Sequence, residues 1–263
     1  IMLPKSGLLS VIPLTWQLYR TIKNFKPQRI LCTLWMPGGT ATYLALQQLK
    51  SKIPYSLIVH GMEIIDSQET LKKRWRHRLL FLKKRVFHQA EQIIAISHYT
   101  KNKILEQKLC PEAKIQVIHN GVNPQRFSWS HDTSLETQHK NYPQLLSVAR
   151  LVPHKGIDQV LYALPPLLRD FPQLQYYIVG QGPDKQRLQD IVSELNLTKN
   201  VRFLGAVNDE DLPLLYAQSD LFILLSREEK HQVEGLGLVF LGAAACGTPS
   251  LGGRSGVISD AIL

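Results

Sequence analysis

Two cations on one short segment carry a chemical signal. Arg150 and Lys155, in ARLVPHKG, lie between an apolar run that predicts a strand and an amphipathic stretch that predicts a helix. A guanidinium can bind a phosphate through two N–H groups and an ammonium adds a point charge, so the pair suits a diphosphate. The alternative is that both are solvated loop cations. Gly156 follows them near the predicted helix start.

The segment VEGLGLVFLGAAACGTPSLGG places a carboxylate, Glu234, directly before a predicted helix. The free N–H groups and the positive dipole at a helix start suit a phosphate, which makes Gly235, Leu236 and Gly237 candidate diphosphate ligands. The Glu234 carboxylate can accept hydrogen bonds from sugar hydroxyls, or it can simply cap the helix.

A histidine and a glycine-bearing turn follow two other predicted strands. His60 opens HGMEI, which also contains Glu63, and an imidazole can exchange protons near neutral pH, although a lone histidine is often only structural. In GQGP, Gly180 and Gly182 leave room for a nucleotide to approach the backbone. The motif lacks the third glycine of the dinucleotide fingerprint and can equally be only a turn.

An acidic run, Asp209 to Asp211 in NDEDLPLLYAQ, could hold a divalent cation. Its place at the start of a predicted helix favours another interpretation, because acidic side chains there cap the N-terminus and interact with the dipole. We therefore expect no metal site.

Short apolar runs alternate with amphipathic stretches, which predicts an α/β fold of parallel sheets covered by helices on both faces. The expected strands span 29–35, 55–60, 92–97, 115–119, 144–149, 174–180, 201–205 and 220–225. The expected helices span 9–24, 39–51, 68–90, 98–109, 156–170, 184–196, 209–218 and 236–246. Ligands of such sheets bind beyond the carboxyl ends of the strands. The polar or glycine residues that follow the expected strands are His60, Ser97, Asn120, Arg150, Gly180 and, further on, Glu234.

A polar stretch with a proline near either end, NPQRFSWSHDTSLETQHKNYP, separates two series of strands and predicts a linker. We expect a partial first domain over 1–123, a linker over 124–142 and a partial second domain over 143–263. The chain opens without the strand and glycine-rich turn that begin a doubly wound domain, and it stops after a new strand, TPSLGG. We therefore expect a fragment truncated at both ends.

The formal net charge of +10 is compatible with nucleic acid, an anionic membrane or a phosphorylated ligand. Eight basic residues fall within 72–85, around an apolar stripe of Trp75, Leu79, Leu82 and Val86. This basic amphipathic helix either packs its stripe on its own domain or contacts acidic lipids. No base-stacking platform or recognition motif accompanies the charge, so we expect no nucleic-acid partner.

The three cysteines show neither disulfide nor zinc spacing, which fits a reducing cytoplasm. The longest weakly polar run, 236–247, is shorter than the ~20 residues that cross a bilayer. We expect a cytoplasmic protein, at most peripheral on the inner face of a membrane.

Taken in order, HGMEI, AISHYTKN, VIHNGVNPQRF, SVARLVPHKG, IVGQGP, VRFLGAV and EGLGLVFLGAAACGTP resemble the retaining glycosyltransferases of family 4. The last four segments together are highly specific. The resemblance implies the GT-B architecture, in which two Rossmann-like domains face a cleft. It also implies a nucleoside-diphosphate sugar, such as a UDP- or GDP-hexose, as donor, and transfer without a metal or other cofactor.

The resemblance also implies roles for individual residues. Arg150 and Lys155 would bind the donor diphosphate, Glu234 the hydroxyls of the donor sugar, and His60 would lie at the reacting centre. Gly205 and the GQGP turn would lie near the base. On the acceptor side the candidates are Glu63, Ser97 and Asn120. Gly242 occupies the position of the family's second glutamate, which contacts the ribose.

Two hypotheses follow. The first is a hexosyltransferase that keeps the anomeric configuration and acts on a glycolipid or a cell-envelope polysaccharide. The second is an inactive remnant of the family that binds nucleotide weakly, because both ends and the second glutamate are missing. A glycine inside a helix costs ~1 kcal/mol relative to alanine, and no local reason for it is evident at 242. We therefore interpret Gly242 as a lesion and expect Gly242→Glu to raise both the melting temperature and the nucleotide affinity.

Overall fold

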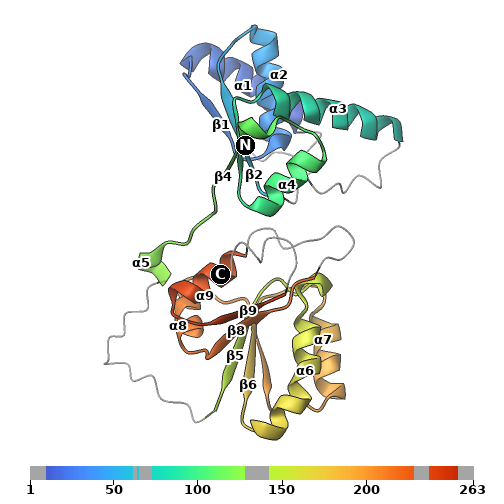
Figure 1. Cartoon of the computed structure of the whole chain (residues 1–263), viewed down its shortest axis with the longest axis vertical. Coiled ribbons are helices and arrows are strands. Elements are labelled where there is room, and N and C mark those ends of the chain that lie inside the picture. Colours follow the sequence, from blue (N-terminus) through green and yellow to red (C-terminus); the bar gives the residue numbers. More distant parts are fainter. Residues whose placement is uncertain (1–9, 62–63, 65–72, 128–141, 228–236, 254–263) are drawn as a thin grey trace. The chain divides into compact units, whose positions relative to one another are not determined.

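The computed structural model describes residues 10–61, 64, 73–127, 142–227 and 237–253, and for 73–78 the backbone alone. The chain divides into two compact units, Ile1–His119 and Asn120–Leu263. Each unit is an α/β domain built on one parallel sheet (Figure 1). This division lies four residues before the end of the first domain expected from the sequence, at 123.

The first unit holds a four-stranded sheet in the order β1-β2-β3-β4. Its strands are β1 (Ile30–Cys32), β2 (Tyr55–Val59), β3 (Gln92–Ala95) and β4 (Ile115–Val117). The helices are α1 (Val11–Phe25), α2 (Thr40–Leu49), α3 (Lys73–Gln89) and α4 (His98–Glu106), with short helical turns at Trp35–Gly39 and Glu112–Lys114. All neighbouring strands are parallel, so their carboxyl ends share one edge.

The core of the first unit follows from the alternation of side chains along β2 and β3. Leu57, Val59, Ile93 and Ala95 point to one face and are fully buried, whereas Ile58 points to the other and is half-buried. The expected strand over 29–35 is shorter than predicted, because the chain turns at Trp35, which is buried and packs on Phe87 of α3.

The second unit holds a five-stranded sheet in the order β7-β6-β5-β8-β9. The strands are β5 (Gln144–Val148), β6 (Gln175–Val179), β7 (Val201–Gly205), β8 (Leu221–Leu224) and β9 (Ser250–Gly252), all parallel. The helices are α5 (Pro124–Phe127), α6 (Ile157–Asp170), α7 (Lys185–Glu194), α8 (Leu212–Ala217) and α9 (Leu238–Ala245), with a 3-10 turn, η4 (Pro153–Lys155). The new strand expected in TPSLGG is β9.

Helices cover both faces of this second sheet, as the alternation of apolar runs predicted. Leu145 belongs to the core under α6 and α7, whereas its neighbour Leu146 belongs to the core under α8 and α9. Figure 1 shows these two helix pairs on opposite sides of the strands. Because both faces of β5 are covered, burial is continuous over Gln144–Ser147 rather than alternating.

The expectation of a linker over 124–142 is wrong for its first four residues. Residues 124–127 form α5, which packs on α9 through a hydrogen bond from Cys246 Sγ to the Phe127 carbonyl oxygen, 3.1 Å. Arg126 also forms an ion pair with Asp209, 3.0 Å. These contacts between residues distant in sequence make α5 part of the second unit; residues 128–141 lie outside the described part of the chain.

Candidate functional site

The strand order of the second sheet reverses at β5, which has β6 on one side and β8 on the other. In doubly wound sheets this reversal opens a crevice beyond the carboxyl ends of the strands, and ligands bind there. Arg150 follows β5 by two residues, and Lys155 closes η4 on the same connection. The Arg150 side chain is exposed and Lys155 is half-buried. The two cations expected to bind a diphosphate therefore lie on one loop at the switch point.

The β5–α6 loop has its shape because Gly156 adopts a left-handed conformation, with φ of 69°. Backbone hydrogen bonds close two tight turns, from Lys155 N to Val152 O, 3.0 Å, and from Gly156 N to Pro153 O, 3.2 Å. A Cβ on Gly156 would lie 1.9 Å from the Leu225 carbonyl oxygen, directly after β8. The loop that carries the cations is thus packed, backbone on backbone, against the end of β8.

The two glycines of GQGP are required by contacts with this same loop. A Cβ on Gly180 would lie 1.8 Å from Ala149 O, and one on Gly182 would lie 2.1 Å from Leu151 O. The Leu151 N–H donates to Gln181 O, 2.9 Å, so the loops after β5 and β6 are hydrogen-bonded to each other. The sequence predicted that a nucleotide approaches the backbone here; in the structure, the neighbour that excludes a side chain is the chain itself. Gly205 ends β7 with φ of 74°, and its carbonyl accepts from Gly180 N, 2.7 Å.

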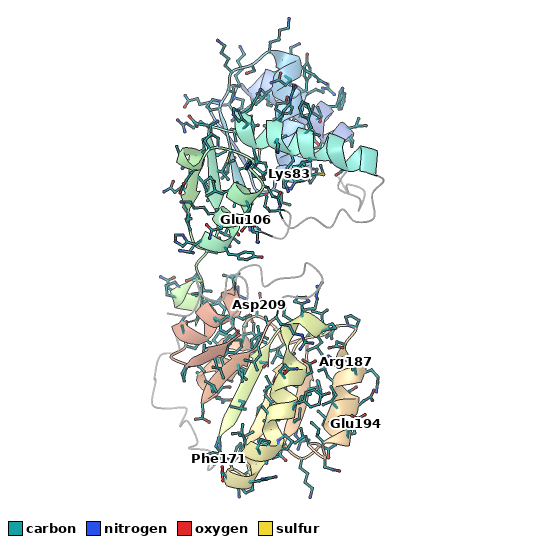
Figure 2. All side chains as sticks on the ribbon, turned by 45° about the vertical axis from the view of Figure 1, so that its right-hand side comes forward. Lys83, Glu106, Phe171, Arg187, Glu194 and Asp209 are labelled. Carbon is teal, nitrogen blue, oxygen red and sulfur yellow. The ribbon has the colours of Figure 1, made fainter. Side chains whose placement is uncertain are left out.

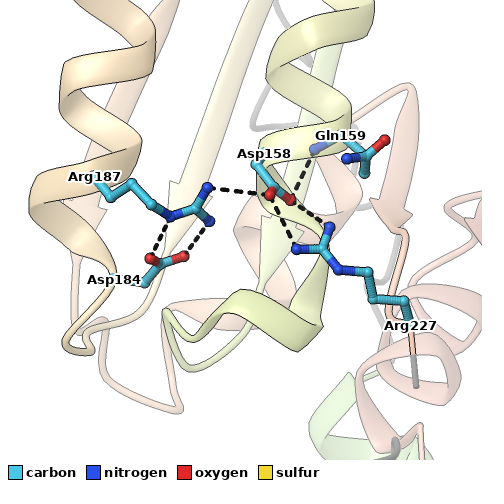
Figure 3. Close-up of polar contacts among 5 residues, drawn as sticks. All are labelled: Asp158, Gln159, Asp184, Arg187 and Arg227. Carbon is cyan, nitrogen blue, oxygen red and sulfur yellow. Dashed lines mark hydrogen bonds and ion pairs between the residues drawn. The ribbon is translucent and has the colours of Figure 1, made fainter. Parts of the chain in front are cut away.

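Four charged side chains form a network around Asp158 in the first turn of α6 (Figure 3). Arg227 binds Asp158 through two N–H groups, at 2.9 and 3.1 Å, and Arg187 binds the same carboxylate at 3.2 Å. Arg187 also binds Asp184 through two nitrogens, each at 2.7 Å. Burial acts to raise the pKa of Asp158, but the hydrogen bonds and charges of Arg227 and Arg187 together lower this pKa below its usual range. The hydrogen bonds from Arg187 to Asp184 raise the pKa of the Arg187 guanidinium.

This network was not predicted from the sequence. Its four members lie at 158, 184, 187 and 227, and no spacing rule relates the first and the last of these positions. They meet because β5, β6 and β8 are neighbours, so that the segments following these strands converge at one edge.

The helix α9 begins at Leu238, after Gly237, which adopts a left-handed conformation with φ of 64°. Glu234, Gly235 and Leu236 lie outside the described residues. The interpretation of Gly242 as a position without a local reason for glycine is wrong. Gly242 is buried, and a Cβ there would lie 3.3 Å from ring carbons of both Phe127 and Tyr216. Two aromatic rings therefore crowd the point where a side chain would begin, and both would have to shift by a few tenths of an ångström to admit a Cβ.

The acidic run before α8 also differs from its expected role. Asp211 occupies the N-cap position of α8, but its side chain makes no capping hydrogen bond. Asp209 instead forms its ion pair with Arg126 of α5, because the docking of α5 brings an arginine within reach. Within the described ranges, no three His, Cys, Asp or Glu side chains are grouped so that they could hold a metal ion.

In the first unit, His60 and Ser97 lie at the carboxyl ends of β2 and β3, on the same edge of the sheet. His60 Nε2 lies 3.1 Å from the Thr33 carbonyl oxygen, so one ring nitrogen is engaged with the backbone after β1. Ser97 is buried and caps α4, where its Oγ accepts from Thr100 N at 3.0 Å. Asn120 begins the second unit and is half-buried. Glu63 lies outside the described residues.

The basic helix α3 packs part of its apolar stripe on its own unit. Val86 is fully buried, and Leu82 is half-buried against the same core. Lys83 (Figure 2), one of the eight expected surface cations, is buried as well; its Nζ donates to Gln107 Oε1, 2.9 Å, and to Ile64 O, 3.3 Å. Lys83 lies three residues before the buried Val86, so the two side chains share nearly one face of the helix. No helix within the described ranges is both long and apolar enough to span a bilayer.

Family comparison covers both units. The model described as "Glycosyltransferase Family 4" matches residues 2–126, and that described as "Glycosyl transferases group 1" matches residues 133–263. A GDP-mannose-dependent alpha-(1-6)-phosphatidylinositol monomannoside mannosyltransferase from Mycolicibacterium smegmatis is 33% identical over 186 residues, 68% of this chain and 48% of the relative. Its namesake from Mycobacterium tuberculosis is 31% identical over 235 residues, 85% of this chain and 58% of the relative. The chain thus spans about half the length of these curated relatives.

Two solved structures show the same fold at low identity. HepE from Anabaena, in complex with UDP and glucose, superposes with a TM-score of 0.70 at 22% identity, over 98% of this chain and 67% of that one. Sucrose-phosphate synthase from Thermosynechococcus elongatus superposes with a TM-score of 0.73 at 21% identity, over 97% of this chain and 63% of that one.

Proposed function

From the premise that the chain belongs to the group 1 glycosyl transferases of family 4, we propose that its second unit binds a nucleoside-diphosphate sugar. The protein would transfer the hexose, with retention of configuration, to a lipid or polysaccharide acceptor. The observation that carries the proposal is the loop after β5, which presents Arg150 and Lys155 at the switch point of the sheet.

Electrostatics favour a diphosphate at this loop. A diphosphate leaving group gains negative charge as the bond to the sugar breaks, and fixed cations beside it stabilise that charge. Arg150 can supply two N–H groups and Lys155 a compact charge. Because these cations neutralise the diphosphate, we infer that no metal is needed, and chelation with EDTA should leave the nucleotide affinity unchanged.

The relatives support the choice of substrates. The two mycobacterial relatives are named for GDP-mannose as donor and a phosphatidylinositol mannoside as acceptor, and the HepE structure contains UDP. GDP and UDP are therefore the first nucleotides to test, and a lipid-linked sugar is the first acceptor class.

The proposal is tested by calorimetry of UDP and GDP with the 263-residue chain. Arg150→Ala and Lys155→Ala should each weaken binding tenfold or more, since a charge-assisted contact contributes roughly 1.5 to 3 kcal/mol. Lys199→Ala is the matched control, because this exposed lysine lies two residues before β7 and so at the opposite edge of the sheet. Equal affinities in all three variants would remove the assignment.

Calorimetry together with a transfer assay decides between enzyme and remnant. Micromolar binding of either nucleotide, followed by release of nucleoside diphosphate from a nucleotide-sugar in the presence of a lipid acceptor, supports the enzyme. Undetectable binding of both nucleotides supports an inactive remnant of the family.

The first unit offers a surface for acidic lipids, and we propose a peripheral membrane contact there. On α3, Lys84 and Arg85 are exposed, and Phe81 is 59% exposed with the Arg85 guanidinium 4.5 Å from its ring centroid. Lys84→Gln combined with Arg85→Gln should reduce sedimentation with anionic vesicles, at ~1 kcal/mol per cation near the surface. Arg29→Gln, on an exposed pair with Glu91, is the control.

A further inference from the structure

Arg227 joins the two segments that flank the switch point of the second sheet. It lies three residues beyond β8, and its backbone N–H donates to His154 O, 2.8 Å, next to Lys155 in η4. Its guanidinium binds both oxygens of Asp158 in the first turn of α6, at 2.9 and 3.1 Å (Figure 3). One residue thus holds the cationic loop at two points, on either side of Lys155 and Gly156.

The contact between Arg227 and Asp158 affects the charge of the loop as well as its position. Asp158 lies three residues after Lys155, and its side chain is only 6% exposed. Burying a carboxylate costs free energy, and its negative charge also repels an anion that approaches the same loop. Arg227 and Arg187 supply the opposite charge, and Asp184 in turn accepts from Arg187. Among the described residues, the four side chains named carry two positive and two negative charges.

We propose that Arg227 is a positioning residue for the donor diphosphate: it fixes the loop that carries Lys155 and neutralises the Asp158 carboxylate beneath that loop. This inference rests on the proposed function, because it concerns the same diphosphate site. Without Arg227, the loop loses a bidentate anchor, and the partly compensated carboxylate of Asp158 reduces the attraction of Lys155 and Arg150 for phosphate.

The test is calorimetry of UDP and GDP with the 263-residue chain and three variants, each accompanied by a melting curve. Arg227→Gln should weaken nucleotide binding several-fold, because the loop that carries Lys155 loses an anchor and the Asp158 carboxylate keeps less compensating charge. Arg227→Lys keeps the charge but loses the planar fork, so its affinity should lie between those of wild type and Arg227→Gln. Combining Arg227→Gln with Asp158→Asn removes the unbalanced carboxylate and should recover most of the lost affinity.

Salt dependence separates this role from simple loss of stability. The difference in affinity between wild type and Arg227→Gln should narrow as salt concentration rises, because the charge of Asp158 is then screened. Arg29→Gln removes an arginine–carboxylate pair of the first unit and should leave the affinity unchanged.

The outcomes distinguish this inference from the proposed function. If Lys155→Ala weakens binding but Arg227→Gln lowers only the melting temperature, the inference is overturned while the function stands. A double variant that binds as weakly as Arg227→Gln overturns the electrostatic part of the inference, since neutralisation of Asp158 would then play no part. If wild type binds neither nucleotide, the proposed function fails and the inference fails with it.

Discussion

The α-carbon of Gly156 packs against Leu225 so closely that a Cβ on Gly156 would lie 1.9 Å from the Leu225 carbonyl oxygen. The same glycine has φ of 69°, in the left-handed region that side-chain-bearing residues rarely adopt. Glycine at 156 therefore serves two purposes, a left-handed turn before α6 and a direct backbone contact between the β5 and β8 connections. Both fix the loop that carries Lys155.

Gly156→Ala should destabilise the second unit by more than its backbone strain alone. The left-handed conformation costs roughly 1 to 2 kcal/mol for alanine, and the collision with Leu225 adds to this. Gly205→Ala is the matched control, because Gly205 has φ of 74° and open space where its Cβ would lie. Thermal unfolding followed by circular dichroism should show a much larger loss for Gly156→Ala, and equal losses would contradict the proposed collision.

Gly242→Ala should lower stability by about 1 kcal/mol, because overpacking at 1 to 3 kcal/mol outweighs the ~1 kcal/mol gain in helix propensity. The rings of Phe127 and Tyr216 would both have to move by a few tenths of an ångström. In a Phe127→Leu background the same substitution should become neutral or stabilising. Urea unfolding of the four proteins gives the coupling between the two positions, and an additive result would show that the rings do not restrict residue 242.

The pair of arginines on Asp158 predicts a specific dependence of stability on pH. The pKa of Asp158 is lowered in the folded protein, so its contribution is fully present above about pH 4, the unfolded pKa, and is lost as the pH falls through the folded pKa. Asp158→Asn should reduce the free energy of unfolding by about 2 kcal/mol at pH 7 and by less at pH 3. Asp170→Asn, on an exposed side chain at the end of α6, should show no such difference between the two pH values.

Ser97→Ala should destabilise the first unit by about 1 kcal/mol, because it removes the hydrogen bond that caps α4. Ser97→Thr keeps the hydroxyl and should recover most of this loss. Trp35, which is 5% exposed in the core of the first unit, provides the fluorescence signal for denaturant unfolding. If Ser97→Ala is as stable as wild type, the capping hydrogen bond does not stabilise the first unit.

The sequence alone determined which segments are strands and helices and where the cationic loop lies. The strand expected over 144–149 is Gln144–Val148, and the helix expected from residue 98 begins at His98. These features were predictable because they depend on neighbours within a few positions: buried runs, amphipathic periods and turn residues. The positions of Arg150 and Lys155 were predictable for the same reason, because they depend only on a strand and the turn that follows it.

Only the tertiary structure decided what surrounds that loop. Asp158 and Arg227 are 69 residues apart in the sequence. Gly242 packs against Phe127, which belongs to the segment that the sequence predicted to be a linker. The sequence predicted Lys83 to be one of several surface cations, whereas in the structure its ammonium group binds Gln107 and Ile64. Such contacts depend on strand order and helix rotation, which no local pattern encodes, because they are set by how all the apolar faces are buried together.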